Sequence, residues 1–355
     1  MPELPEVETV ARDLRPRLLG AEIAGARVSW ARTLRTHEPE AFAAAATGRV
    51  VEAVGRRAKL LVIELSGGLA MTIHLKMTGQ LFVVLASALA DPYVRFVLEL
   101  ADGRELRFRD IRKFGRVGLY ERDPSTGDLV VERGGAGVFA RTGPEPLDEA
   151  FGLREFRRRL RARRGRLKPL LLDQTFLAGV GNIYADEALW AARLHPLRPA
   201  SSLRPADEKR LFDDIRRVLT EAIERRGSSV DDYTAPDGDG SMQERLQVYQ
   251  RTGEPCLRCG RPVRRIVIGA RSTHFCSWCQ RLRAAERAGA TAILRTITGG
   301  VPARRGRRWT ELPAADGASG ETPEEVARRR SERTRRAAAT RRAAARRAMT
   351  SPREA

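Results

Sequence analysis

The sequence predicts an α+β fold, in which a helix leads into an antiparallel β-sandwich and a helical half follows. Three observations support this prediction. Short β-rich runs fill residues 22–122, helically spaced apolar residues recur between 152 and 226, and four cysteines lie within residues 256–279. The chain has 355 residues, enough for two or more domains that each bury a core. The divisions that we expect are 1–123, a linker 124–146, 147–244, 245–280 and a tail 281–355.

The first half begins with an amphipathic helix over residues 5–19. Pro5 suits the first turn of a helix, the apolar residues from Val7 to Leu18 repeat at helical spacing, and Gly20 ends the pattern. The β-rich runs that follow are separated by turn signals such as Ser-Gly-Gly at 66–68 and Asp-Gly at 102–103. This alternation predicts an antiparallel sandwich or barrel.

The second half reads as helical after a linker rich in Gly, Pro and Asp. Helices are predicted at 152–163, 167–176, 183–192 and 205–226. A glycine-rich turn, Gly179-Val-Gly181-Asn182, lies between two of them. Residues 227–243 lack periodicity and predict a mobile loop.

The four cysteines predict one structural zinc ion. Cys256, Cys259, Cys276 and Cys279 have the spacing C-x2-C-x16-C-x2-C, which is typical of a four-thiolate site with a β-hairpin between the pairs. Two disulfides are the alternative, and nothing in the sequence indicates the export that would favour them. Four protein ligands leave no open position, so the expected Zn²⁺ is structural and not catalytic.

The net charge of +20, from 65 Lys and Arg against 45 Asp and Glu, predicts a polyanionic partner or an acidic membrane surface. The sequence has no run of 18 apolar residues and no signal-peptide pattern. We therefore expect a cytoplasmic protein that binds nucleic acid. Beyond residue 300 the chain has 15 Arg against 7 acidic residues, and we expect the tail to be mostly disordered, with a helix-start signal at 322–325.

The N-terminal Met1-Pro2-Glu3 can provide a nucleophile with an adjacent acid. Removal of Met1 leaves Pro2 with a free secondary amine, and an α-amino group titrates near about 7.7–8.0, whereas a lysine titrates near about 10.4. Such an amine can attack a sugar carbon and form an iminium, with Glu3 moving the protons. The structural alternative is that Pro2 and Pro5 only frame the start of a helix.

Together, MPELPEVE at the N-terminus, the β-rich half, GVGNIYADE between helices and the four-cysteine module resemble the formamidopyrimidine-DNA glycosylases over about residues 1–280. The resemblance implies an N-terminal catalytic sandwich, a helix-two-turn-helix DNA-binding domain with a lesion loop at 227–243, and a zinc ribbon. It implies a bifunctional DNA glycosylase and abasic-site lyase in base excision repair. Such an enzyme removes 8-oxoguanine and formamidopyrimidines through a Schiff base and β,δ-elimination.

The resemblance also assigns the catalytic residues. Pro2 corresponds to the amine that attacks C1′, and Glu3 to the carboxylate that protonates the opening sugar. Lys59 corresponds to a strand lysine that transfers protons and contacts phosphate; a plain exposed lysine is the alternative. Arg271 corresponds to the zinc-ribbon arginine that holds the phosphate beside the lesion, and a solvated charge is the alternative.

Further residues are implied to contact DNA, because a base in a duplex must be extruded before chemistry. Asn182 corresponds to a phosphate ligand or caps its helix, and Glu187 orients the Pro2 amine or only favours the helix dipole. The expected gap-fillers are Met77, Arg112 and Phe114, of which the two apolar residues alone are more often core. His74, Arg163 and Lys168 fall where the family contacts phosphates or the damaged nucleotide; a buried histidine is the alternative for His74.

One departure from the family is visible, since Asp91 or Tyr93 stands where many members have a DNA-contacting histidine. Two rival functions remain: an endonuclease VIII-like glycosylase for oxidised pyrimidines, and a non-catalytic protein that binds damaged double-stranded DNA. Leu4 and the three gap-fillers disfavour the first, and the pair Pro2 and Glu3 disfavours the second. We expect a monomer associated with a bacterial nucleoid. The opposite-base preference, the relative activity on the two lesions and the role of the tail stay open.

Overall fold

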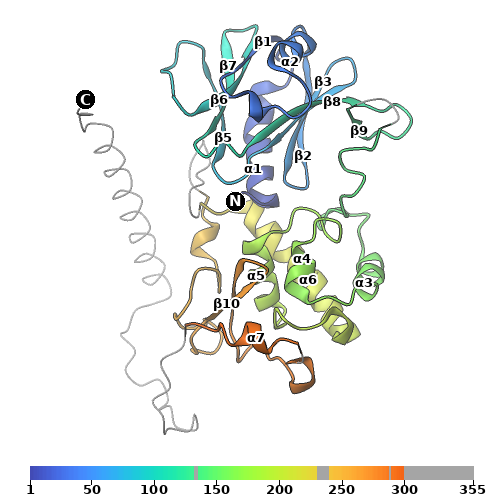
Figure 1. Ribbon diagram of the computed structural model, residues 1–355, viewed down its shortest axis with the longest axis vertical. Helices are drawn as coiled ribbons and strands as arrows, with labels where there is room; N and C mark the ends of the chain where they lie inside the picture. The colour runs from blue at the N-terminus through green and yellow to red at the C-terminus, as the bar shows by residue number, and fades with distance from the viewer. Residues whose placement is uncertain (132–134, 230–239, 288, 300–355) are drawn as a thin grey trace, which may run out of the picture. The chain divides into compact units, whose positions relative to one another are not determined.

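The computed structural model describes residues 1–131, 135–229, 240–287 and 289–299 (Figure 1). Of the predicted loop 227–243, the stretch 230–239 lies outside the described residues, as does the tail from residue 300, with its predicted helix start. No helix in the described ranges is long and apolar enough to cross a membrane.

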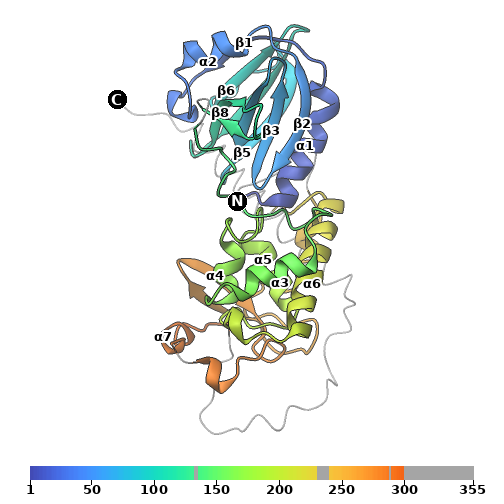
Figure 2. The same ribbon diagram turned by 90° about the vertical axis from the view of Figure 1, so that its right-hand side faces the viewer.

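Two antiparallel sheets form the N-terminal half, which confirms the predicted sandwich (Figure 2). The first sheet has the order β1 (Ile23–Val28), β6 (Val94–Leu100), β7 (Arg104–Asp110) and β5 (Gly79–Leu85). The second has the order β2 (Val51–Arg57), β3 (Leu60–Leu65), β4 (Leu69–His74), β8 (Arg116–Arg122) and β9 (Leu129–Val130). Apolar side chains of both sheets, including Met71 and Phe96, share one buried core. Strand β9 pairs with β8 inside the predicted linker, so the sheet continues beyond residue 123.

Two helices pack on the sandwich. Helix α1 (Leu4–Leu18) lies against β2 and ends before Gly20, whose φ of +78° is the left-handed conformation expected just after a helix. Helix α2 (Pro39–Ala46) was not predicted, because its alanine run lies among β-rich segments. Its fully buried Phe42 contacts Phe96 edge to face, with ring centroids 5.3 Å apart, and thereby joins the core.

The helical half contains the four predicted helices, which are α3 (Leu153–Arg161), α4 (Leu167–Leu172), α5 (Asn182–Ala191) and α6 (Pro205–Glu224). Their apolar faces form a second core, and Leu4 from the start of α1 belongs to it. The first residues of the chain therefore pack between the sandwich and the helices, where Figure 1 marks the N-terminus.

The zinc module ends in the hairpin of β10 (Arg264–Ile268) and β11 (Arg271–Phe275). We expected the tail to start at residue 281, but the chain continues through the short helices η4 (Ala284–Arg287) and α7 (Thr291–Leu294) and pairs with β10 at Thr298. Four apolar residues of this segment, Leu282, Ala290, Ile293 and Leu294, pack on the hairpin core. The sequence did not predict this packing, because these apolar residues are scattered among arginines.

Candidate active site

Glu3 lies at the N-terminus of helix α5, far away in the sequence. Its Oε1 accepts a hydrogen bond of 2.9 Å from the backbone N–H of Ile183, and the side chain is 2% exposed. Gly181, the residue before the helix, leaves the space that this carboxylate fills, because a Cβ at Gly181 would come within 2.3 Å of the Glu3 carboxyl carbon. The helix N-terminus favours the negative charge that it receives.

A backbone contact holds the adjoining residues of both segments together. The N–H of Leu4 donates to the carbonyl of Gly179 at 3.1 Å, and Gly179 has a φ of +81°. A side chain there would be strained and would meet Leu4 at 2.7 Å. The glycine-rich turn thus allows the N-terminal residues, including the buried Pro2, to approach α5 closely.

Glu6 is a buried carboxyl group next to Glu3, and the sequence reasoning did not select it. Its Oε2 accepts the N–H of Glu3 at 2.8 Å, while Oε1 accepts the N–H of Ser228 at 2.8 Å and the hydroxyl of Tyr184. Burial, together with the nearby Glu3 carboxylate, raises the pKa of Glu6 above its usual value. The signal in the sequence is its position three residues after Glu3, which forms a capping box at the start of α1.

Lys59 lies in the two-residue turn between β2 and β3, and not on a strand as predicted. The preceding Ala58 adopts a φ of +55°, so the chain reverses sharply there. Burial lowers the pKa of the Lys59 ammonium; the negative charges of Glu3 and Glu6 oppose this shift, and Arg271 adds to it. These interactions place Lys59 among the charged groups around the N-terminus.

Glu145 fixes the Lys59 turn, although the sequence reasoning treated its segment as a linker. Its carboxylate accepts hydrogen bonds from Nη1 of Arg56 at 2.6 Å, Nη1 of Arg57 at 2.9 Å and the N–H of Ala58 at 2.6 Å. Hydrogen bonds to charged groups contribute about 1.5–3 kcal/mol each. A linker carboxylate therefore holds the lysine turn in place, and no sequence pattern pairs the two.

Arg271 lies at the tip of the zinc hairpin and is exposed. The turn before it, Gly269-Ala270, has positive φ values of +53° and +61°, as the two-residue hairpin requires. Asn182, the first residue of α5, donates from Nδ2 to the carbonyl of Ser272 at 3.0 Å, and its buried Oδ1 has no hydrogen-bond partner among the residues that the structure describes. The cap position belongs to Gly181, so Asn182 ties the hairpin to the helix and does not cap α5.

Glu187 binds the backbone of the segment that leads into the zinc module, and the role in orienting Pro2 that the resemblance implies stays a prediction. Its buried carboxylate accepts three backbone hydrogen bonds, from the N–H groups of Gln247 at 2.8 Å, Val248 at 2.9 Å and Tyr249 at 2.8 Å. Burial raises its pKa, which the three hydrogen bonds oppose. Glu187 therefore anchors the segment that leads into the zinc module, whereas Glu6 accepts the N–H of Glu3 at the start of α1.

Lys168 is fully buried and does not reach the surface where a phosphate would bind. Its Nζ donates to Asp186 at 2.6 Å and to the carbonyl of Asn182 at 2.9 Å. The second oxygen of Asp186 accepts the N–H of His274 at 2.9 Å. Lys168 is buried, and not at a phosphate site, because its ion pair with Asp186 joins α4, α5 and the zinc hairpin.

The predicted gap-fillers lie on two neighbouring loops that Asp110 joins. Thr78, which follows the half-buried Met77, donates its hydroxyl to Asp110 and accepts the N–H of Arg112 at 3.2 Å. The other oxygen of Asp110 accepts the N–H of Gly115 at 2.6 Å. Between these contacts Arg112 is exposed and Phe114 is 49% exposed, so a buried carboxylate holds both side chains outward.

Two other expected contacts, and the residues at the departure from the family, have different placements. His74 accepts the N–H of Lys76 on Nδ1 at 3.1 Å, and burial lowers its pKa to about 3, so it is neutral with Nε2 as the donor. Arg163 is exposed. At the departure from the family, Asp91 pairs with Arg109 at 2.6 Å, and the ring of Tyr93 stacks on the same arginine.

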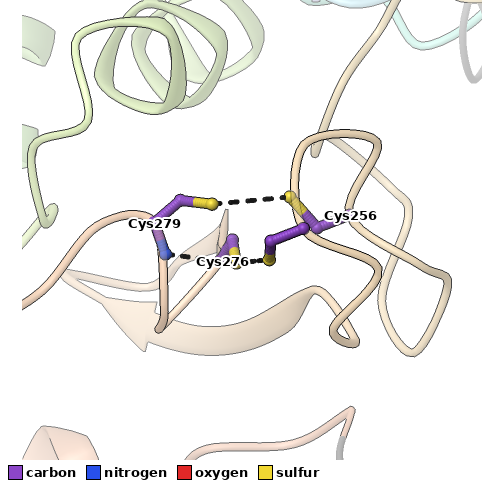
Figure 3. A group of neighbouring side chains, drawn as sticks. Cys256, Cys276 and Cys279 are labelled. Carbon is purple, nitrogen blue, oxygen red and sulfur yellow. Dashed lines mark hydrogen bonds between the residues drawn. The ribbon is translucent and has the colours of Figure 1, made fainter. Parts of the chain in front are cut away.

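The four cysteines meet as the spacing predicts, and their sulfur atoms all lie within 4.8 Å of one another. Figure 3 shows the side chains of Cys256 and Cys279 facing each other. Their sulfur atoms are 4.0 Å apart, and those of Cys259 and Cys276 are 3.5 Å apart. Tetrahedral zinc with bonds of about 2.3 Å needs sulfur atoms roughly 3.8 Å apart. The indole N–H of Trp190 donates to Cys256 at 3.4 Å, a second-layer contact typical of thiolate ligands. The donor set therefore fits one structural zinc ion.

Taken together, the N-terminal amine position lies among two carboxyl groups and a lysine of lowered pKa, with an exposed arginine at the tip of a zinc hairpin. An amine, a proton donor and a proton acceptor in one place suit covalent catalysis through an iminium. The two loops that carry Met77, Arg112 and Phe114 are called the wedge loops. Together with the exposed arginine, they suit a substrate that has phosphates and stacked bases.

Three family profiles match the chain in order. They are described as the formamidopyrimidine-DNA glycosylase N-terminal domain at residues 1–117, the formamidopyrimidine-DNA glycosylase H2TH domain at 142–234, and a zinc finger found in FPG and IleRS at 253–282. Proteins named formamidopyrimidine-DNA glycosylase from Herpetosiphon aurantiacus and Chloroflexus aurantiacus are each 48% identical over 282 residues. The alignments cover 79% of this chain and 100% and 98% of the relatives.

Solved structures agree with these matches. A complex of the Lactococcus lactis Fpg with DNA that contains an abasic site is 36% identical, with a TM-score of 0.72, and the alignment covers 79% of this chain and 100% of that one. A complex of a mutant of the same protein with DNA that contains Fapy-dG has the same identity, TM-score and coverage.

Proposed function

The chain belongs to the formamidopyrimidine-DNA glycosylase family, and from this premise we propose which of its residues perform the reaction and on which lesions. The family makes it a base excision repair glycosylase with abasic-site lyase activity. We propose that it removes formamidopyrimidines and 8-oxoguanine from duplex DNA. The observation that carries the proposal is the cluster of Glu3, Glu6 and Lys59 around the Pro2 end of α1.

Pro2 is the proposed nucleophile. Once Met1 is removed, the nitrogen of Pro2 uses its lone pair to form a bond to C1′, and the base leaves with the electrons of the glycosidic bond and takes up a proton. The Pro2 nitrogen then gives up its proton, the bond between C1′ and the ring oxygen breaks as that oxygen takes up a proton, and an iminium forms between Pro2 and C1′. The iminium makes the C2′ proton acidic, so elimination expels the 3′-phosphate and then the 5′-phosphate.

Glu3 and Lys59 supply the proton transfers in this proposal. The Glu3 carboxyl, held by the N–H of Ile183, donates to the ring oxygen of the sugar as the ring opens. The lowered pKa of Lys59 gives it a larger neutral fraction than an ordinary lysine, which suits a base that accepts a proton near neutral pH. Arg271 binds the phosphate beside the lesion and stabilises the departing phosphate.

The remaining residues bind and deform the DNA. Met77, Arg112 and Phe114 fill the gap after the nucleotide is extruded. Asn182, His74 and Arg163 are proposed phosphate ligands, whereas the buried Lys168 and Glu187 support the scaffold. The zinc ion, bound by the four cysteines, holds the hairpin that carries Arg271.

We divide the chain into a catalytic sandwich at 1–123, a linker to 146, a helix-two-turn-helix domain to 244 and a zinc ribbon from 245. The ribbon includes the folded residues after 280. We also propose a monomer that acts at the bacterial nucleoid.

Borohydride trapping tests the proposal. The protein is incubated with borohydride and duplexes that contain 8-oxoguanine, thymine glycol or an abasic site, and the covalent product is measured by gel mobility and intact mass. We expect trapping at 8-oxoguanine and the abasic site, with the adduct on Pro2. Retained Met1 or a Pro2→Gly change should lower the yield. Absence of an adduct on every duplex would refute the covalent mechanism, and a preference for thymine glycol would refute the lesion assignment.

A further inference from the structure

A folded segment after the zinc-finger match covers one side of the zinc hairpin. The zinc-finger match ends at residue 282, and relatives aligned over their full length cover 79% of the chain. We call residues 281–287 and 289–299 the C-terminal extension. Its Thr298 exchanges two backbone hydrogen bonds with Arg265 of β10, at 2.9 and 3.0 Å, so it adds a short third strand to the hairpin.

The only acidic residue in the sequence of the extension is already paired. Glu286 is 8% exposed and forms an ion pair of 3.1 Å with Arg198, which also pairs with Asp207 at 3.0 Å. Glu286 further accepts the N–H of Arg283 at 2.9 Å. Its charge is therefore buried and neutralised in the interior, and the outer surface of the extension keeps its arginines without a local carboxylate.

An exposed aromatic ring holds two arginines, one at the start of the extension and one in the zinc module. The guanidinium carbon of Arg261 lies 3.8 Å from the ring centroid of Trp278, and that of Arg281 lies 4.2 Å from it. Trp278 is 47% exposed. Cation–π stacking restricts the side chains but leaves their positive charges and N–H donors available. Within the described residues, neither arginine forms an ion pair with a carboxylate.

A hollow continues this surface across the extension. It has a volume of about 490 Å³, and its lining consists of His195, Phe275, Ser277, Arg281, Leu282, Arg287, Leu294 and Ile297. Burial lowers the pKa of His195 to about 3, so the histidine is neutral. No acidic side chain lines the hollow, and Arg287 has no ion-pair partner among the residues that the structure describes. The surface is therefore positive without local compensation.

We propose that Arg261, Arg281 and Arg287 form a second DNA-binding surface, which contacts backbone phosphates of duplex DNA outside the lesion site. Arginines with restricted side chains and unpaired charges suit phosphate oxygens, which accept from two N–H groups at once. A duplex that is already bound at the lesion site is the polyanion at highest local concentration, which favours DNA over another acidic partner. This inference rests on the proposed function and adds contacts that carry no sequence information.

The salt dependence of binding to undamaged DNA tests this surface in the full chain. In a triple variant, Arg261→Gln, Arg281→Gln and Arg287→Gln, three phosphate contacts are lost. The slope of log affinity against log salt concentration should become shallower by about 2.7, because each contact contributes about 0.9. A triple variant with lysine at the same positions keeps the charges and should retain most of the slope.

A matched control removes three arginines that do have ion-pair partners. Arg12, Arg158 and Arg217 are 57%, 71% and 57% exposed and pair with carboxylates on their own helices. Changing them to Gln alters the net charge equally but should leave the slope unchanged. An equal loss of slope in this control, or an unchanged slope in the Arg261, Arg281 and Arg287 variant, would overturn the proposal.

Two further measurements separate this proposal from the catalytic one. Borohydride trapping on a short lesion duplex, which only fills the lesion site, should be unchanged in the glutamine variant. If the unaltered protein gave no covalent adduct, the proposed function would be refuted, but the proposal of this surface would not. If the triple variant loses zinc, the single change Arg287→Gln, which does not touch Trp278, should still reduce the slope by about 0.9. No reduction in that variant also overturns the proposal.

Discussion

Changing Gly181 to Ala should impair base excision selectively, because Gly181 leaves room for the carboxylate of Glu3, the proposed proton donor. Gly181 has φ −131° and ψ −157°, which alanine also adopts. The new Cβ would lie 2.3 Å from the carboxyl carbon of Glu3 and 2.5 and 2.7 Å from its oxygens. The carboxylate must move by about 1.1 Å to reach an ordinary contact of 3.4 Å, which breaks its 2.9 Å hydrogen bond from Ile183.

A displacement of this size sets the expected effect. Misplacing a catalytic group by about 1 Å can reduce a rate roughly 100-fold, equivalent to about 2.7 kcal/mol in the barrier. The rate of 8-oxoguanine excision is measured under single-turnover conditions, and affinity is measured with a duplex that contains an abasic analogue. We expect the rate to fall about 100-fold with little change in affinity, because no phosphate ligand is altered.

Gly152→Ala is the matched control. Gly152 also precedes a helix, with φ −91° and ψ 171°, and a Cβ there would meet nothing within 4 Å. Both substitutions change the same kind of residue at the same position of a helix. An excision rate for Gly181→Ala equal to that of Gly152→Ala would refute the role of Glu3 inferred from its position.

Three further changes test the other parts of the site. Thr78→Val removes both hydrogen bonds that join the wedge loops through Asp110, and eversion of the target base, followed by 2-aminopurine fluorescence, should slow roughly tenfold. Lys59→Met should abolish lyase activity but raise the free energy of unfolding in urea. Burial lowers the pKa of Lys59 below the unfolded value of 10.5, so the charged ammonium destabilises the native state. The gain in unfolding free energy from Lys59→Met is therefore full at a pH below the native pKa. It is lost as the pH rises from the native pKa through 10.5. Chelation of zinc should release the hairpin and Arg271, which lowers DNA affinity and changes tryptophan fluorescence.

Each of these changes has a control. Thr78→Ser keeps the hydroxyl, so a loss as large as that of Thr78→Val would contradict the coupling of the loops. Lys209→Met removes an exposed lysine, 61% accessible and paired with Asp213, and should not give the pH-dependent gain. A gain for Lys59→Met that is equal at pH 7 and above 10.5 would contradict the lowered pKa. Added zinc should restore DNA binding after chelation, and unaltered binding without zinc would contradict the structural role of the metal.

Local sequence patterns predicted those elements whose structure depends mainly on residues close together in the chain. Helix α1 was expected over 5–19 and runs from Leu4 to Leu18, because its apolar period and Gly20 are local signals. The cysteine spacing likewise predicted the zinc module, since metal geometry restricts the chain near each pair. By contrast, α2 was not predicted, because it lies among β-rich segments and only the buried position of Phe42 shows its place in the core.

Contacts between distant segments were beyond the reach of the sequence. Nothing near Glu145 shows that it holds the Lys59 turn, and nothing near Glu187 shows that it binds the backbone at 247–249. The burial of Lys168 and the folding of the extension after residue 280 were not predicted for the same reason. In a basic chain, a buried lysine or a folded arginine-rich segment looks like another part of the charged surface.

The hydrogen bonds between the first residues and the segment that begins at Gly179 set an order of events during synthesis. Leu4 and Glu3 bind backbone groups at Gly179 and Ile183, which the ribosome makes some 180 residues later. At about 5–20 residues per second, the start of the chain waits roughly ten to forty seconds for those partners. Because Pro2 is buried in the folded protein, we expect removal of Met1 to be easiest within this interval. If Pro2 is the nucleophile, as proposed, slower elongation should therefore yield a larger fraction of processed, active enzyme.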